Sequence, residues 1–259
     1  MIRICLDPGH GGTDRANRGP TGYVEADGTL AIAKLVRDEL AATGAFQVRL
    51  TRESDIALGL RERARIGSSF SADLFVSIHT DAFNGRARGP VAFNSVDLPD
   101  DRPLAARMTA SIAKAFGVPD RGARNRPADP AHPGQSGATS SNPEDFYAVI
   151  DEAQDKGIPH VVLLECLMHD NPADEAILKT EVGVRLIAQC IAQCIAATYG
   201  VQYPPKTGVA RDLETLNRRL AGAGRQQLDA IYWERMAVKG QMIPGELVAA
   251  FIARMTMMP

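Results

Sequence analysis

Two histidines and a carboxylate stand where this sequence could most readily do chemistry. His10 lies in the glycine-rich segment 6–12 that follows an apolar opening run, and His79 ends a second apolar run at residues 74–78. Glu25 leads a stretch of helical periodicity. Two imidazoles and one carboxylate are a ligand set of open catalytic zinc sites, which keep a fourth position for water or substrate. The sequence therefore predicts a zinc centre that supports hydrolysis.

Each of these residues has an ordinary explanation when it is taken alone. His10 is then a loop histidine, Glu25 a first-turn carboxylate favoured by the helix dipole, and His79 a hydrogen-bonded core histidine. The joint occurrence of all three at element ends favours the metal site over coincidence.

Strand and helix patterns alternate along the chain, which predicts an α/β fold. We expect a twisted, mostly parallel sheet flanked by helices, with a small C-terminal helical appendage. Open α/β folds bind ligands at the carboxyl edge of the sheet, where the three candidate ligands would gather. The predicted strands span residues 2–6, 46–50, 74–78, 91–96 and 158–164, and the predicted helices run from Glu25 to Gly44 and over residues 60–70, 104–116 and 173–199.

Composition and charge narrow the class of protein. The chain has 259 residues and a net charge of -2, so it can bury a full core and carries no polybasic signal for nucleic acid. No window approaches the roughly 18 uninterrupted apolar residues of a membrane span. The first residues enter a predicted strand directly, and we expect no export signal. The four cysteines suggest buried thiols in a reducing compartment, and Cys190 and Cys194 are interpreted as small hydrophobic residues on one helix face.

The chain divides into residues 1–200 as the catalytic domain, 201–208 as a linker and 209–259 as a helical C-terminal region. Three short amphipathic helices are predicted in that last region, which also carries Tyr232 and Trp233. Its role stays open between wall binding, packing onto the catalytic domain and formation of a homodimer. Residues 119–143 lack periodicity and are predicted to be a long surface loop, which either borders the substrate groove or is a disordered insertion.

Several motifs, taken in order, carry a family resemblance that extends from residue 2 to about 200. The sequence resembles the zinc-dependent N-acetylmuramoyl-L-alanine amidases of the Amidase_3 family. The resemblance implies a twisted sheet flanked by helices and cleavage of the amide between N-acetylmuramic acid and L-alanine in peptidoglycan. It also implies that His10, Glu25 and His79 bind Zn²⁺ and that Glu165 is the catalytic carboxylate. The motifs are residues 7–12, Glu25, 51–52, Arg63, 77–82 and 164–165, followed by Asn171 and Asp174.

The chemistry of amide hydrolysis supports the role of Glu165. An amide needs an activated water and a proton for the departing amine, and a carboxylate beside that water can move the proton. An ionisable group directly after the apolar run 161–164 is costly to bury without a task or a partner. A serine route is less attractive because the chain has no G-x-S-x-G elbow, and Cys166 lacks a persuasive histidine and carboxylate around it.

The sequence departs from the family pattern at a few positions near these motifs. Asp81 stands where the family usually has Asn, and Leu167 and Met168 replace a Gly-Phe pair. Asp170 replaces a small hydroxyl residue. These changes leave the zinc ligands intact and bear on peptide specificity and the shape of the groove. His169, in the same segment, is interpreted as a substrate-side residue or as a group behind the ligands.

Three functions agree with these features, and peptidoglycan is the expected partner in each. The first is a phage endolysin that stays in the cytoplasm until it is released to the cell wall. The second is a host autolysin or cell-separation amidase whose signal peptide has been removed, which would place it in the periplasm or outside the cell. The third is a wall-binding protein that keeps the fold without the activity, and the presence of Glu165 with all three ligand candidates weighs against it.

Overall fold

A computed structural model describes residues 1–128 and 145–203 of the chain. The predictions for residues 129–144, which include His132, and for residues 204–259 lie outside these described residues. The helices and strands, in chain order, are β1 (Ile2–Pro8), α1 (Glu25–Ala41), β2 (Phe46–Leu50), α2 (Leu60–Ser69), β3 (Leu74–Asp81), β4 (Val91–Asn94), the short 3-10 helix η1 (Pro99–Asp101), α3 (Arg102–Phe116), β5 (Ala123–Arg124), α4 (Ala148–Asp155), β6 (Val161–Met168), α5 (Pro172–Leu178) and α6 (Glu181–Thr198).

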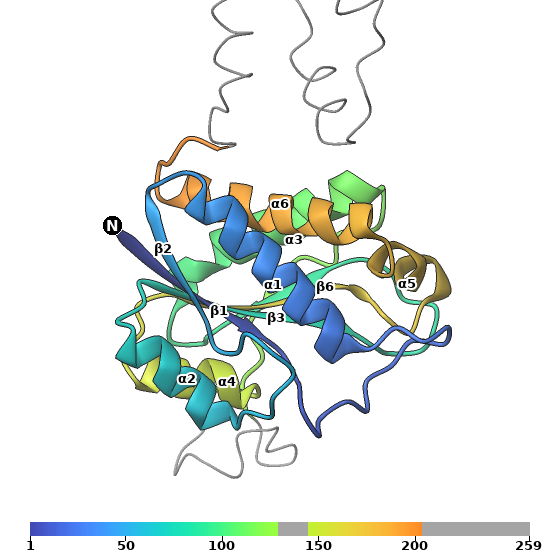
Figure 1. The fold of residues 1–259 in the computed structure, drawn as a ribbon, viewed down its shortest axis with the longest axis horizontal. Helices are drawn as coiled ribbons and strands as arrows, with labels where there is room; N and C mark the ends of the chain where they lie inside the picture. Colours follow the sequence, from blue (N-terminus) through green and yellow to red (C-terminus); the bar gives the residue numbers. More distant parts are fainter. Residues whose placement is uncertain (129–144, 204–259) are drawn as a thin grey trace, which may run out of the picture. The chain divides into compact units, whose positions relative to one another are not determined.

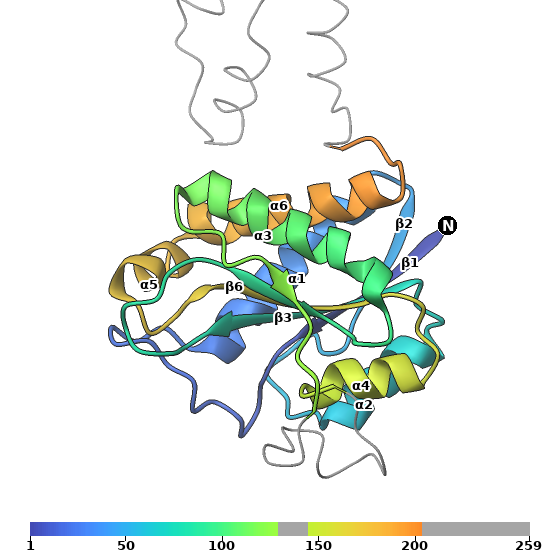
Figure 2. The same ribbon diagram turned by 180° about the vertical axis from the view of Figure 1, so that it is seen from behind.

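The described strands form a six-stranded sheet in the order β2-β1-β3-β6-β4-β5. Strands β2, β1, β3 and β6 are parallel, and β4 pairs with β6 in the antiparallel direction. Helices α1, α3 and α6 cover one face, and α2 and α4 cover the other (Figures 1 and 2). The predicted α/β class with a mostly parallel sheet is therefore confirmed.

Each central strand sends alternate side chains into two separate cores, as the period of two in a strand requires. In β3, Leu74 and Val76 join the core under α1, α3 and α6, whereas Phe75 joins the core under α2 and α4. The same alternation in β6 places Leu164 in the first core and Leu163 in the second. By this alternation His79 of β3 and its register partner Glu165 of β6 share the α2/α4 face of the sheet.

The structure corrects several predicted boundaries. The predicted helix 173–199 is two helices, because Thr180 caps a new helix by accepting a hydrogen bond from the backbone N–H of Gly183. Strand β3 continues through His79 to Asp81, so His79 lies inside the strand rather than beyond its end. Strand β6 likewise runs through Glu165 to Met168.

Two further predictions concern apolar segments. All four cysteines are buried and free, and Cys190 and Cys194 lie in the core, as expected for small hydrophobic residues. Of the helices in the described ranges, α6 has the length and composition to cross a bilayer, and half of it is buried inside the fold. It packs against α1 and α3.

Two buried arginines fix the loop that follows β1. The guanidinium of Arg52 donates to the carbonyl oxygens of Pro8, Gly9 and Ala26 at 3.0, 2.9 and 2.7 Å. Arg63 donates to the carbonyl of Pro8 at 2.7 Å and to that of His10 at 2.8 Å. The loop carbonyls thus find buried donors, which a turn without regular backbone pairing otherwise lacks.

The Arg63 guanidinium also forms a buried ion pair with Asp7. Its Nη1 lies 2.8 Å from Oδ1 of Asp7, and Thr51 and Ser77 donate hydroxyl hydrogen bonds to the same carboxylate. Burial opposes the charge of Asp7, but Arg63 and these hydrogen bonds outweigh it and hold the pKa of the carboxyl below its ordinary value. The pair therefore stays ionised and its geometry stays fixed.

We predict that Arg52→Met destabilises the protein by about 3 kcal/mol, because it removes three buried hydrogen bonds to carbonyl oxygens at about 1 kcal/mol each. Urea unfolding followed by circular dichroism measures the effect. The matched control is Arg65→Met on α2, whose exposed guanidinium pairs with Glu62 and whose loss should cost less than about 0.5 kcal/mol. Equal effects of the two substitutions would contradict the anchoring role of Arg52.

Candidate active site

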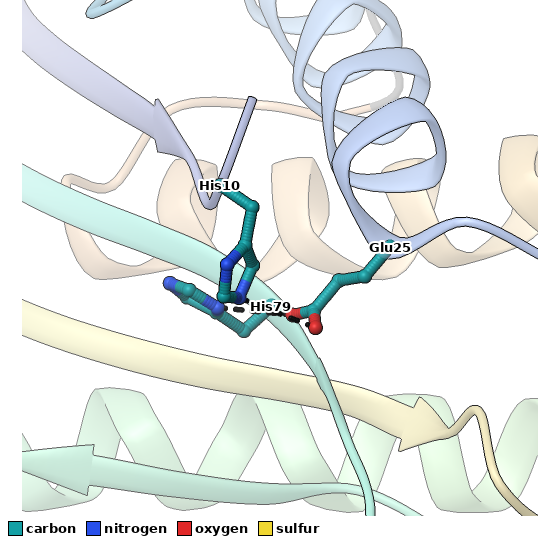
Figure 3. A group of neighbouring side chains, drawn as sticks. All are labelled: His10, Glu25 and His79. Atoms are coloured by element: carbon teal, nitrogen blue, oxygen red, sulfur yellow. Dashed lines mark hydrogen bonds and ion pairs between the residues drawn. The ribbon is translucent and has the colours of Figure 1, made fainter. Parts of the chain in front are cut away.

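The three predicted ligands meet at the carboxyl edge of the sheet. His10 comes from the loop after β1, Glu25 is the first residue of α1, and His79 projects from β3 (Figure 3). One nitrogen or oxygen of each side chain lies within 4.8 Å of those of the other two. Two imidazole nitrogens and a carboxylate oxygen at this spacing could hold one metal ion, and the set of donors suits a transition metal such as zinc.

Glu25 is at the centre of this group. Its Oε2 lies 3.2 Å from Nε2 of His10, and its Oε1 lies 3.0 Å from Nδ1 of His79. The carboxylate also accepts hydrogen bonds of 2.9 Å from the backbone N–H of Thr80 and from the side-chain amide of Asn17. Burial disfavours the charge, but the two histidines outweigh it and lower the pKa of Glu25, so the carboxylate is ionised.

Neighbouring groups set the orientation of the ligand side chains. Asp14 Oδ2 lies 2.8 Å from Nδ1 of His10, which leaves Nε2 of His10 toward Glu25. A carboxylate behind a histidine fixes its tautomer and raises its basicity as a ligand. His169 is buried at the edge of the same pocket, and its Nδ1 donates to the carbonyl of Thr80 at 2.8 Å and lies 3.9 Å from Oε2 of Glu25. The N–H of Thr80 in turn reaches Glu25, so His169 is connected to the ligands through one residue of β3.

Gly9 provides the space for the His79 ring. A Cβ atom built on Gly9 would overlap Cε1, Nδ1 and Nε2 of His79. The loop backbone therefore approaches the ring as closely as a residue without a side chain allows. Gly9 therefore affects the site by making room for the His79 ring, and not only by shaping the turn after β1.

Glu165 lies beside the three ligands on the neighbouring strand. It is the register partner of His79 in the β3/β6 pair and is 9% exposed. Within the described residues, its Oε2 is buried without a hydrogen-bond partner. Burial, followed by the negative charges of Glu25 and Asp81, raises the pKa of Glu165 well above its ordinary value. An unpartnered buried carboxyl of this kind is typical of a functional group.

One pocket of about 470 Å³ connects Glu165 with the candidate metal ligands. Its polar lining includes the ligands together with Asp14, Asn17 and Asp7. Aromatic and apolar residues, Tyr147, Val149 and Leu163, also line it. A carboxyl group and a metal-binding group that share one such cavity can act on the same bound molecule.

The structure also shows which groups Asp81 and His160 contact. Asp81 also lines the pocket, and its Oδ2 lies 2.7 Å from Nη1 of Arg121, which neutralises the extra charge at this position. His160 lies directly before β6, although the predicted strand 158–164 included it, and its Nδ1 is 2.6 Å from Asp101, outside the pocket. The roles of Asp14, Asn17 and Tyr147 were not predicted. Asp14 had a local signal, because it follows His10 by four residues in the glycine-rich loop.

The fold and the site together define an α/β domain with a candidate metal centre and a separate buried carboxyl at the carboxyl edge of its sheet. A family model described as N-acetylmuramoyl-L-alanine amidase, Amidase_3, matches residues 4–197. The chain belongs to this family, and the resemblance expected from the sequence motifs is confirmed.

Relatives with curated names agree with the family. The chain is 37% identical over 126 residues to N-acetylmuramoyl-L-alanine amidase AmiC of Neisseria meningitidis, an alignment that covers 47% of this chain and 30% of that protein. It is 30% identical over 191 residues to the probable cell wall amidase LytH of Staphylococcus aureus, with coverage of 73% and 55%. The chain thus spans about a third to a half of the length of these relatives.

Solved structures show the same fold. The catalytic domain of CwlV, an N-acetylmuramoyl-L-alanine amidase from Bacillus (Paenibacillus) polymyxa, aligns with a TM-score of 0.64 at 27% identity and covers 78% of this chain and 100% of that one. An N-acetylmuramoyl-L-alanine amidase from Clostridium difficile aligns with a TM-score of 0.64 at 26% identity, with coverage of 77% and 97%.

We predict that Gly9→Ala lowers the affinity for a divalent metal by at least about tenfold while the domain stays folded, because the new methyl group displaces the His79 ring. Competition with a chromogenic chelator measures the affinity. Gly59→Ala is the matched control, since a Cβ there meets nothing within 4 Å. Wild-type affinity in Gly9→Ala would show that the metal does not need His79 in this position.

Proposed function

We propose that this protein is a zinc-dependent N-acetylmuramoyl-L-alanine amidase that hydrolyses the amide between N-acetylmuramic acid and the L-alanine of the stem peptide in peptidoglycan. The observation that carries the proposal is the pocket that Glu165 shares with the group formed by His10, Glu25 and His79. Membership of the amidase family supports the same reaction.

His10, Glu25 and His79 would hold the zinc ion. Zinc fits this set because it takes imidazole nitrogen and carboxylate oxygen, and because three protein ligands leave a position open for catalysis. When bound, the ion supplies a Lewis acid that polarises the amide carbonyl and lowers the pKa of water. Asp14 and Thr80 keep the ligand side chains in place through the contacts described above.

Glu165 would move the proton that amide hydrolysis requires. In its ionised form the carboxylate accepts a proton from the attacking water, and as the acid it returns that proton to the nitrogen of the departing L-alanine. Its raised pKa suits the second step, because a carboxyl that holds a proton more readily than usual can act as the acid. The chain needs no covalent intermediate for this route.

The biological setting follows from the substrate. Peptidoglycan lies outside the cytoplasmic membrane, so we propose that the protein acts there. An amidase can reach the wall as a host enzyme or as a phage endolysin. The relatives favour a host cell-wall amidase, because AmiC and LytH are proteins of bacteria. Release of a phage endolysin from the cytoplasm remains a prediction. Wall binding by residues 209–259, or a homodimer through them, also remains a prediction outside the described residues.

We predict about one zinc ion per molecule in the purified protein and near-complete loss of zinc in His79→Ala, because two ligands hold the ion far less tightly than three. Elemental analysis after dialysis measures the content. His160→Ala is the matched control, since His160 pairs with Asp101 away from the pocket. Full stoichiometry in His79→Ala would place the metal elsewhere.

We also predict that Glu165→Gln keeps its zinc and its fold but loses about 10²-fold to 10⁴-fold in turnover, because an amide of nearly the same shape cannot carry the proton. New L-alanine amino termini released from purified peptidoglycan report the rate. Glu62→Gln on the exposed surface of α2 is the control. Activity of Glu165→Gln within a few fold of the wild type would rule out Glu165 as the proton carrier.

A further inference from the structure

An exposed arginine is stacked on aromatic rings beside the pocket. The Cζ atom of Arg126 lies 3.4 Å from the centroid of the Phe146 ring and 5.7 Å from that of Tyr147. Tyr147 lines the pocket together with Glu165. The guanidinium therefore lies beside an aromatic residue that lines the same pocket as the candidate metal ligands.

The backbone and the rings around Arg126 hold this group in place. The N–H of Phe146 donates to the carbonyl of Arg126 at 2.8 Å, and Pro127 bridges to Asp145. The Tyr147 ring packs against Phe93 of β4 with centroids 4.7 Å apart. Much of the conformational entropy of the arginine is thus already lost in the free protein, which favours binding of a ligand.

The stacked geometry leaves the edge of the guanidinium available. Stacking uses the flat face of the group, whereas its N–H bonds lie in the plane and suit a carboxylate with two oxygens. In the described part of the chain, Arg126 contacts the Tyr147 hydroxyl at 3.5 Å and forms no ion pair. Arg121 differs, because its guanidinium is bound to Asp81 at 2.7 Å.

Tyr147 contacts Arg126 through its hydroxyl and lines the pocket that contains Glu165. Burial raises the pKa of the Tyr147 phenol, the hydrogen bond from Arg126 lowers it, and the charge of Glu165 raises it. A ligand that lies along Tyr147 can therefore have one end near Glu165 and another near Arg126.

We propose that Arg126 and Tyr147 form a subsite that binds a carboxylate of the stem peptide while the scissile amide lies near Glu165. This inference rests on the proposed function. The peptide is the part of the substrate that fits, because the lactyl carboxyl of the sugar is consumed in the scissile amide and the N-acetylated sugars are uncharged. Free carboxylates remain on the peptide, and arginine is the residue best suited to bind them.

The test uses two soluble N-acetylmuramoyl-L-alanyl peptides that are identical except that the carboxylates of one are carboxamides in the other. The wild type should cleave the acidic peptide with a kcat/KM about tenfold higher, the size of one charge-assisted hydrogen bond. Arg126→Gln should lose this preference through a higher KM for the acidic peptide, with kcat nearly unchanged. Added salt should weaken the preference of the wild type.

Arg124→Gln is the matched control, since Arg124 is also exposed on the same segment but donates to the carbonyl of Arg121. It should keep the preference. Equal losses for both peptides in Arg126→Gln, or no loss, would overturn the subsite.

A binding measurement separates this inference from the proposed function. The free acidic peptide, without the sugar, is titrated into the wild type and into Arg126→Gln, and its dissociation constant should rise about tenfold in the variant. If the wild type cleaves neither substrate, the proposed function fails while this comparison still decides the subsite. Identical dissociation constants in the two proteins would overturn the subsite even if the amidase activity is present.

Discussion

The buried ion pair between Asp7 and Arg63 is the interaction on which the site depends. Removing two charges from water is costly, and the cost is offset here only because Thr51, Ser77 and the loop carbonyls complete the hydrogen bonds of both groups. The same arginine reaches the carbonyl of His10, which has a positive φ of 58°. The ion pair thus links the end of β1 to the backbone of the first candidate metal ligand.

A second constraint is the excess of negative charge around the pocket. The pocket is lined by four carboxylates, those of Glu25, Asp14, Asp81 and Glu165. One of them, Asp81, is paired with Arg121 at this edge of the sheet. Carboxylates so close disfavour one another's ionisation, which is one cause of the raised pKa of Glu165. A divalent cation between the histidines and Glu25 would offset this charge, so the electrostatics of the site agree with the chemistry of its ligands.

How much the sequence could predict depended on the range of the interactions. His10, Glu25 and His79 could be found because strand ends and helix starts leave local signals, and parallel strands bring those ends to one edge. The break at Thr180 was missed because apolar periodicity continues across it. The buried positions of Arg52 and Arg63 and the stacking of Arg126 on Phe146 could not be predicted without the family, because each is set by segments far apart in the chain.

Register explains how Glu165 comes to lie on the side of the pocket. A strand sends successive side chains to opposite faces, and a shift of one residue in the β3/β6 pairing would turn Glu165 toward α1, α3 and α6. Its neighbours Leu164 and Cys166 fill that core, so the shift would also expose apolar surface to the pocket and bury a carboxylate among aliphatic side chains. The apolar residues of β6 therefore help to hold Glu165, the proposed catalytic carboxyl, on the side of the pocket. The core under α1, α3 and α6 thus fixes the register of the β3/β6 pair, and this register leaves Glu165 on the opposite face of the sheet, beside the pocket.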